Sequence, residues 1–318
     1  MPGLCDRPSG VVSLSDLFAV EPVADEHADA RVRLPHYVEP IEGEALLSWL
    51  IRVGRGLGLS PVELSRGAFG VDALAEPEWW RRPADLTLRL IARRGGLSRE
   101  RLEAMTLRGW ERACDDEDAD RFSAARRHER PSRVRGRPIA VCRQCLAHAS
   151  QAHLQLSWML GWTAVCERHG TVLESVCGVC KRPLRIGSLA LNRCADFLIC
   201  GRCGSSQRGG SGEAAHASTV ALQAVLIAGK RKGRTLLPGL GPMDWQMTIT
   251  FVDMVLAMVW SGQSDERRER LFARIADDID MTDELWVTQP WRSNYGALLI
   301  LAWVLSDLAS RLRVMATS

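Results

Sequence analysis

The alternation of apolar and polar positions predicts helices in the first third of the chain. Apolar side chains recur at helical spacing from Glu44, and Gly58 supplies a stop. The apolar positions of this helix are Leu46, Leu47, Leu50, Ile51, Val53 and Leu57. The run Ser60-Pro61-Val62-Glu63 then gives an N-cap serine, a proline at the first helical position and a glutamate at the third. A second helix is therefore expected to begin there and to reach about Phe69.

Two more short helices are expected after an irregular stretch around Trp79-Trp80. Gly95-Gly96 ends the third helix, whose apolar positions are Leu86, Leu88, Leu90 and Ile91. Ser98 caps the fourth helix, which is expected to reach Leu107. Short helices joined by tight glycine turns predict a helix-turn-helix domain over residues 40–113, with a generic helical bundle as the alternative. Residues 1–39 are expected to form a loosely ordered tail, with one short helix around Leu14 to Val20.

The last third of the chain has the same helical signature. A C-terminal domain over residues 217–318 is expected to be all-helical. Its predicted helices are Val220 to Ile227, Met247 to Trp260, Asp265 to Ile279 and Tyr295 to Leu312. Residues 206–216, rich in glycine and serine, predict a flexible spacer before it. The longest apolar run, Gly296 to Leu305, is about half of the ~20 residues that cross a bilayer, so no membrane span is expected.

Composition and charge narrow the class of protein. A chain of 318 residues with 46% hydrophobic and 25% charged residues is typical of a globular protein with more than one domain. An acidic cluster and an arginine-rich stretch predict a charged linker over residues 114–138, because such blocks pack no core. Residues 121–234 carry 19 basic and 5 acidic side chains between net acidic flanks. This basic middle favours a polyanion or an acidic protein surface as partner, with a solvated arginine-rich surface as the alternative.

Eight of the ten cysteines lie between Cys142 and Cys203, mostly as CxxC pairs. Each such pair supplies two ligands from one tight turn, called a knuckle, and two knuckles make one tetrahedral zinc site. The sequence therefore predicts tandem zinc modules over residues 139–205, with two structural Zn²⁺ ions per chain. The predicted ligands are Cys142, Cys145, Cys166 and His169 for the first ion and Cys177, Cys180, Cys200 and Cys203 for the second. Cys194, His148 and His153 are left out, although Cys194 stays open as a replacement ligand in the second site.

Both zinc sites are predicted to be structural rather than catalytic. A catalytic zinc keeps one coordination position open for water, whereas four ligands fill each predicted site. The chain has no GxxxxGK[ST], GxSxG or HExxH motif and no deaminase pattern, so no enzymatic activity is expected and a zinc hydrolase is the least favoured hypothesis. Thiolate ligands must stay reduced and no secretory signal is visible, which predicts a cytoplasmic location.

Two features of the sequence occur together in a family-specific order. The first is the segment from Pro40 to Arg52, PIEGEALLSWLIR, followed by Gly58-Leu-Ser60. The second is the order CxxCL, Trp158, CxxHG and CxxC between Cys142 and Cys180. Over roughly residues 35–205 the chain thereby resembles the TniQ/TnsD family of transposition target-selection proteins. The expected fold is mainly α, with an N-terminal helix-turn-helix domain, small zinc-ribbon or knuckle elements and a helical C-terminal domain.

The resemblance implies a non-enzymatic adaptor that links a target-recognition element to an AAA+ ATPase regulator of transposition, which recruits the transposase. In some relatives the recognition element is an RNA-guided CRISPR complex, and in others the family member or a partner reads DNA itself. The alternative is therefore an autonomous sequence-specific DNA-binding protein, either a target-site reader or a transcription factor. Target DNA, a guide RNA and a second copy of the chain in a homodimer all remain open as partners.

Candidate contact residues flank the cysteine region on both sides. The basic residues expected to contact nucleic acid or an acidic partner are Arg133, Arg135, Arg137, Lys230, Arg231, Lys232 and Arg234. A helix end stabilised by its dipole explains the run from Lys230 equally well. Trp79 and Trp80, beside Arg81-Arg82, are a hypothesis for a partner anchor, because exposed Trp and Arg dominate interface hot spots. The remaining tryptophans in apolar periodic settings are expected in the core: Trp49, Trp158, Trp260 and Trp303.

Overall fold

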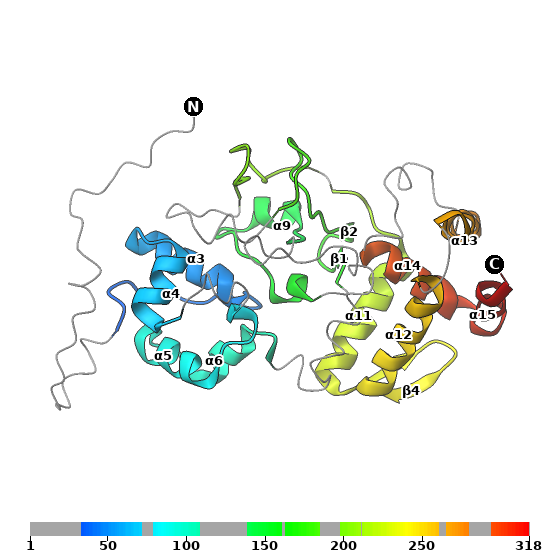
Figure 1. Ribbon diagram of the computed structural model, residues 1–318, viewed down its shortest axis with the longest axis horizontal. Coiled ribbons are helices and arrows are strands. Elements are labelled where there is room, and N and C mark those ends of the chain that lie inside the picture. Colours follow the sequence, from blue (N-terminus) through cyan, green and yellow to red (C-terminus); the bar gives the residue numbers. More distant parts are fainter. Residues whose placement is uncertain are drawn as a thin grey trace. The chain divides into compact units, whose positions relative to one another are not determined.

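The computed structural model describes residues 33–71, 79–108, 139–160, 163–184, 198–210, 212–260, 265–279 and 294–317 (Figure 1). Within these residues the protein is mainly helical with a few short strands, as predicted. It divides into two compact units, each described by itself. The first unit contains the described residues 33–108, 139–159 and 175–210, and the second contains 160–174 and those from 212 onward. None of the described helices is long and apolar enough to cross a membrane.

The helices of the first unit begin and end where local chemistry requires. Over residues 33–108 they are α3 (Leu46–Leu57), α4 (Pro61–Phe69), α5 (Asp85–Gly95) and α6 (Arg99–Ala104), with a 3-10 turn η1 (Trp79–Arg81) before α5. Later in the chain the same unit contains α9 (Arg143–His148) and the 3-10 turn η3 (Leu156–Met159). Ser60 and Glu63 form the predicted capping box of α4, and Ser98 accepts from Arg101 N at the start of α6. Gly58 ends α3 in the left-handed region at φ 68°. These four helix predictions are confirmed in type and, apart from the end of α6, in position, while their assignment as a helix-turn-helix stays a prediction.

The end of α6 differs from the prediction. The helix stops at Ala104 rather than at Leu107. The backbone carbonyl of Met105 accepts a hydrogen bond from Leu46 N at 2.8 Å, so this peptide group pairs with the start of α3. Thr106 Oγ1 in turn donates to the Glu103 carbonyl at 2.9 Å. Tertiary pairing therefore replaces the last predicted turn.

A buried carboxylate fixes the start of α3. Glu44, 1% exposed, accepts hydrogen bonds from Ile41 N at 3.0 Å and Ser48 Oγ at 2.7 Å. The guanidinium of Arg52 donates to both of its oxygens, from Nε at 2.9 Å and from Nη2 at 2.6 Å. Ser48 Oγ also accepts from Leu154 N at 3.0 Å. The polar residues of the Pro40–Arg52 segment thus hold α3 against the chain that leads away from the first knuckle.

The second unit contains further helices and two hairpins. Its elements are β1 (Val165–Cys166), β2 (Thr171–Val172), α11 (Ala217–Lys232), β3 (Arg234–Leu237), β4 (Gly241–Asp244), α12 (Trp245–Trp260), α13 (Asp265–Asp278), α14 (Asn294–Ser306) and α15 (Leu308–Thr317). Helix α14 is apolar all round and packs against both α11 and α12, as the second unit in Figure 1 shows. Its buried side chains form the centre of this core, including Leu299, Ile300 and Val304.

Two predictions for the C-terminal region are wrong: that it is all-helical, and that one helix runs from Tyr295 to Leu312. An antiparallel hairpin follows α11, with Arg234 opposite Asp244 and Leu237 opposite Gly241. Its strand β3 alternates exposed and buried side chains, and Gly239 and Gly241 adopt positive φ at the turn. The helix predicted from Tyr295 to Leu312 is two helices, because Asp307 interrupts it and its carboxylate accepts from Ser310 N at 3.4 Å as the cap of α15.

Both edges of the β1–β2 hairpin are occupied. The fully buried amide of Gln223 on α11 accepts from Ala164 N at 2.8 Å and Val165 N at 3.0 Å and donates to Val165 O at 2.7 Å. On the other side, Val172 N donates to Glu213 O at 2.8 Å. Residues 213–215 therefore pair with this hairpin, and this part of 206–216 differs from the flexible spacer predicted because its backbone has hydrogen-bond partners.

Candidate metal centres

Three of the four predicted ligand pairs lie in the same kind of tight turn. In each, the amide that follows the second ligand donates to the carbonyl of the first: Gly170 to Cys166 at 2.8 Å, Lys181 to Cys177 at 3.0 Å and Gly204 to Cys200 at 2.9 Å. The donor residue has positive φ in all three cases, 61°, 55° and 70° respectively. Two of the three are glycines, which adopt this conformation without a steric penalty.

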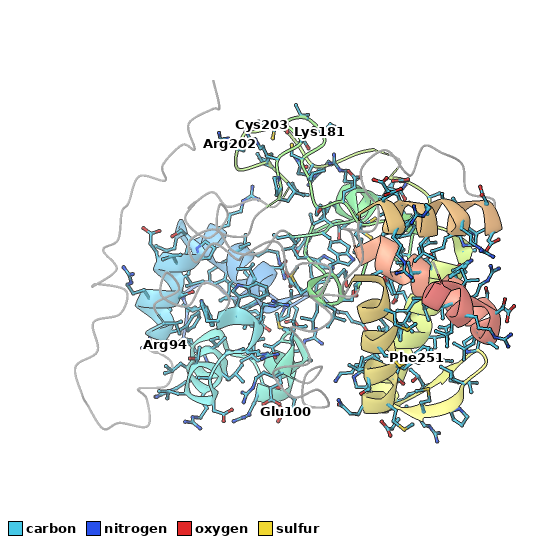
Figure 2. All side chains as sticks on the ribbon, turned by 45° about the vertical axis from the view of Figure 1, so that its right-hand side comes forward. Arg94, Glu100, Lys181, Arg202, Cys203 and Phe251 are labelled. Carbon is cyan, nitrogen blue, oxygen red and sulfur yellow. The ribbon has the colours of Figure 1, made fainter. Side chains whose placement is uncertain are left out.

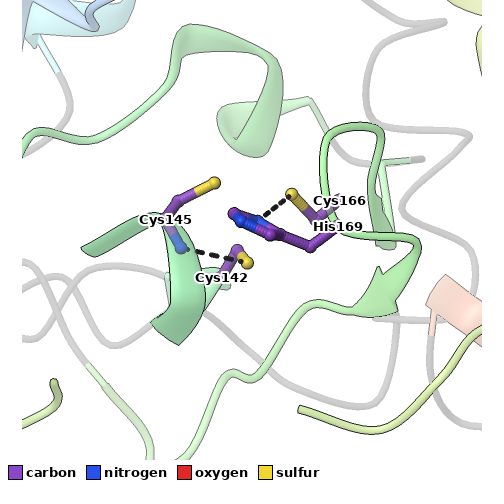
Figure 3. A group of neighbouring side chains, drawn as sticks. All are labelled: Cys142, Cys145, Cys166 and His169. Carbon is purple, nitrogen blue, oxygen red and sulfur yellow. Dashed lines mark hydrogen bonds between the residues drawn. The ribbon is translucent and has the colours of Figure 1, made fainter. Parts of the chain in front are cut away.

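The fourth pair is built on a helix start. Cys142 is the N-cap of α9 (Arg143–His148), and its Sγ accepts from Cys145 N at 3.4 Å. Figure 3 shows both cysteines of this turn beside Cys166 and His169, with the Cys145 N to Cys142 Sγ contact as a dashed line. His148, on the same helix, is exposed and its Nδ1 lies 2.8 Å from the Gln144 carbonyl, while His153 contacts Gln151 and Gln155. Neither histidine belongs to a metal-type group of the described residues.

The first group brings together Cys142, Cys145, Cys166 and His169. Their ligand atoms all lie within 4.8 Å of one another (Figure 3). Cys166 Sγ lies 3.6 Å from His169 Nδ1. A tetrahedral zinc with bonds of about 2.3 Å to sulfur and about 2.0–2.1 Å to nitrogen would separate these two atoms by about 3.5–3.6 Å. The donor set and the spacing of this pair therefore suit a tetrahedral metal such as zinc.

The second group consists of Cys177, Cys180, Cys200 and Cys203, again within 4.8 Å of one another. The Sγ atoms of Cys177 and Cys203 lie 3.7 Å apart, and those of Cys180 and Cys200 lie 3.8 Å apart. Adjacent corners of a tetrahedral zinc–thiolate site lie about 3.8 Å apart, whereas disulfide sulfurs lie about 2.05 Å apart. The structure thus brings together the two ligand sets that the sequence predicts, and Cys194 lies outside the described residues.

Two polar residues beside the second group were missed by the sequence analysis. Ser205 Oγ lies 3.2 Å from Cys177 Sγ and 3.0 Å from Cys203 Sγ. The amide of Gln207, a residue 1% exposed, donates to Cys177 Sγ at 3.4 Å. Partners of this kind orient metal ligands and stabilise their charge. The available sequence signal was their position directly after the last knuckle, where the chain turns back over the sulfurs.

The electrostatics of the second group favour a bound cation. Burial raises the pKa of Cys177, but hydrogen bonds from Ser205, from backbone amides and from Gln207 outweigh it and lower that pKa to about 5. The pKa of Cys180 rises to about 11, since burial and the neighbouring sulfurs outweigh the hydrogen bond from the Arg182 backbone. Four thiols at these distances cannot all ionise unless a positive charge balances them. A divalent metal would supply that charge.

The predicted contact residues are found in different environments. Arg133, Arg135 and Arg137 lie outside the described residues. Lys230 is 9% exposed, and its Nζ lies 5.6 Å from the centroid of the Trp245 ring. Its ammonium group therefore makes a cation–π contact inside the second unit rather than pointing into solvent. The other members of the run are exposed: Arg231, Lys232 and Arg234.

The tryptophans mostly contribute to packing. Trp79 and Trp80, the hypothetical partner anchor, are 8% and 3% exposed, because η1 packs against α3. Rings buried to this extent leave little surface for a partner, which argues against the anchor hypothesis. Trp49, Trp158 and Trp303 are buried as expected, and the side chain of Trp260 lies outside those described.

Comparison with known proteins gives a match to one family. Residues 35–173 match the family model described as TniQ. No curated protein matches the chain. The matched region contains the Glu44 network and all four members of the first metal group. Over residues 35–173, the chain is therefore similar to the TniQ family.

Proposed function

We propose that the protein is a non-enzymatic adaptor in transposition, which links a target-recognition element to an AAA+ ATPase regulator. The observation that carries this proposal is the TniQ match over residues 35–173, which makes the chain a transposition-associated protein. The two groups of four ligands support a structural role for the metal, since a full tetrahedral set leaves no position for a catalytic water.

Zinc is the metal proposed for both sites. Cys142, Cys145, Cys166 and His169 would hold one ion, and the four sulfurs from Cys177 to Cys203 would hold the other. Each ion would cross-link short segments that carry little apolar core of their own, so binding energy becomes folding energy. Elemental analysis of the protein, purified under reducing conditions without chelator, should give two zinc ions per chain. One ion or none would refute the tandem-site proposal.

Exposed cations are proposed to contact the recognition element or its nucleic acid. Arg231 and Lys232 end α11 and Arg234 begins β3, so three positive charges lie within one short stretch. Lys230 is left out of this set because of its position over Trp245. The matched test variant therefore changes only Arg231, Lys232 and Arg234 to Ala.

Binding assays with the full-length chain test the adaptor role. The purified AAA+ regulator and the recognition complex should each bind the protein, while random duplex DNA should bind weakly and lose affinity steeply with salt. The triple Ala variant should weaken nucleic-acid contacts at all sequences alike and flatten the salt dependence by about one unit per lost contact. Tight binding to one duplex sequence in the absence of any protein partner would instead support the autonomous DNA-binding alternative.

A further inference from the structure

The surface around the second metal group combines apolar and cationic side chains. Three apolar residues there are unusually exposed: Val176 at 39%, Val179 at 70% and Ile199 at 47%. Three exposed basic residues accompany them: Lys181, Arg182 and Arg202. The described residues 175–184 and 198–210 contain no Asp or Glu. We call these six residues the knuckle surface.

The repeated knuckle geometry explains why these residues are neighbours. Val176 and Ile199 each precede the first cysteine of a knuckle, and each pairs across its own hairpin, with Pro183 and Ser206 respectively. Val179 and Arg202 hold the same position within the two knuckles, directly before the second cysteine. The Sγ contacts of 3.7 Å and 3.8 Å between the knuckles bring both tips together. Figure 2 shows Lys181, Arg202 and Cys203 beside one another at this end of the unit.

The backbone of Lys181 is a second, independent observation. Lys181 is the sole non-glycine residue with positive φ in the part of the chain that the structure describes, at 55°. The equivalent positions after the other two knuckles of this kind are Gly170 and Gly204. A side chain at this position is less favourable than glycine. A lysine at a position where glycine would be less strained points to a task for its side chain outside the fold.

We propose that the knuckle surface docks an acidic segment of a partner protein, with apolar side chains against Val179 and carboxylates against Lys181 and Arg202. Exposed apolar residues rimmed by polar ones mark protein-binding sites, and complementary charge favours an acidic partner. Nucleic acid fits less well, because its phosphates do not cover valine side chains. The described residues 175–184 and 198–210 also offer no aromatic ring on which a base could stack. This proposal rests on the proposed function in one respect: it requires that one of the partners is a protein.

The probe for this surface is a fluorescent synthetic peptide rich in glutamate, with leucine at helical spacing, titrated with the full-length, zinc-loaded chain. Wild type should raise the anisotropy of the peptide. The double variant Val179→Asp/Arg202→Glu should bind at least tenfold more weakly, equivalent to about 1.4 kcal/mol. The matched control Leu86→Asp/Arg89→Glu makes the same charge change at another exposed apolar and basic pair of the first unit, where Leu86 is 62% exposed. It should bind as wild type does.

Lys181→Gly separates docking from folding. This variant should keep both zinc ions and unfold at the same or a higher temperature, because glycine relieves the positive φ. Its peptide affinity should nevertheless fall about threefold, within the range of an exposed ion pair. If Lys181 had only a structural role, the substitution would change the unfolding temperature and the peptide affinity together, or would change neither.

The outcomes that overturn the proposal are distinct from those that overturn the adaptor role. No peptide binding by wild type, unchanged binding by the Val179→Asp/Arg202→Glu variant, or an equal loss in the control would each refute the docking surface. So would selective loss of random duplex binding in that variant with the peptide still bound, which would identify a phosphate contact. A chain that binds the peptide but neither the AAA+ regulator nor the recognition complex refutes the adaptor role alone. A chain that binds those proteins but not the peptide refutes the surface alone.

Discussion

Replacing Glu44 by glutamine tests the buried network that positions α3. The substitution Glu44→Gln keeps the size of the side chain but removes its charge and turns one acceptor oxygen into a donor. The present carboxylate accepts four hydrogen bonds, from Ile41 N, from Ser48 Oγ and twice from Arg52. An amide cannot reproduce all four, so at least one donor would face another donor.

The burial of this ion pair sets the expected loss of stability in Glu44→Gln. Removing one partner of a buried ion pair costs about 3–5 kcal/mol. Arg52 is 13% exposed along its side chain and keeps two acceptors, Gln151 Oε1 and Glu39 O, both at 2.7 Å. These partners soften the loss, and we expect about 2–4 kcal/mol. The matched control Glu266→Gln removes the same charge from a pair with Arg270, where the side chains are 78% and 62% exposed, and should cost less than about 0.5 kcal/mol.

Hydrogen exchange measured by mass spectrometry on the full-length chain reports the effect locally. Amides of Leu46–Leu57 should exchange about 30-fold faster or more in Glu44→Gln, since 1.4 kcal/mol corresponds to a factor of ten. The Leu154 amide, which donates to Ser48, should lose protection with them. Glu266→Gln should leave all these amides unchanged. Exchange in α3 within about threefold of wild type would refute the argument that this pair holds the helix in place.

Three further changes have expected outcomes of their own. Cys177→Ser should remove one of the two metal ions in elemental analysis, because a serine hydroxyl does not replace a thiolate ligand, and retention of both ions would contradict the second site. Gly229→Ala should lower the stability of the second unit by about 1–3 kcal/mol in thermal unfolding, because the new Cβ would overlap the methyl group of Thr235. Adding Thr235→Ser should restore the lost stability, and a loss that persists would show that the Thr235 methyl group is not its cause. Ser60→Ala should cost about 1 kcal/mol through the lost cap of α4, and a neutral result would show that Glu63 alone satisfies that helix start.

The accuracy of the sequence analysis follows the range of the interactions involved. Gly58, Ser60 and Ser98 act on backbone groups within a few residues, so the helix ends that they set were predictable. The metal ligands were predictable for the same reason, because a CxxC turn places both sulfurs by local geometry.

Features set by distant contacts were not predictable. The sequence presents Lys230 as one of a run of surface cations, but Trp245, on another element, determines its burial. Strands β3 and β4 are too short for their period-two pattern to stand out beside a basic helix end, and only the turn glycines signalled them. Gln207 and Ser205 have no local signature beyond their position directly after the last knuckle, since their role depends on the Cys177 sulfur, which approaches from another hairpin.

The closed edges of the β1–β2 hairpin bear on the order in which the protein acquires its metal. The side chain of Gln223 occupies one edge and residues 213–215 occupy the other, so hydrogen bonds hold this hairpin from both sides. Cys166 and His169 would therefore be presented to a metal ion as an ordered pair, and little chain entropy would remain to be lost at these two residues on binding. Under the proposed zinc binding, loading would start at this pair, and the sulfurs of Cys142 and Cys145 would complete the coordination afterwards.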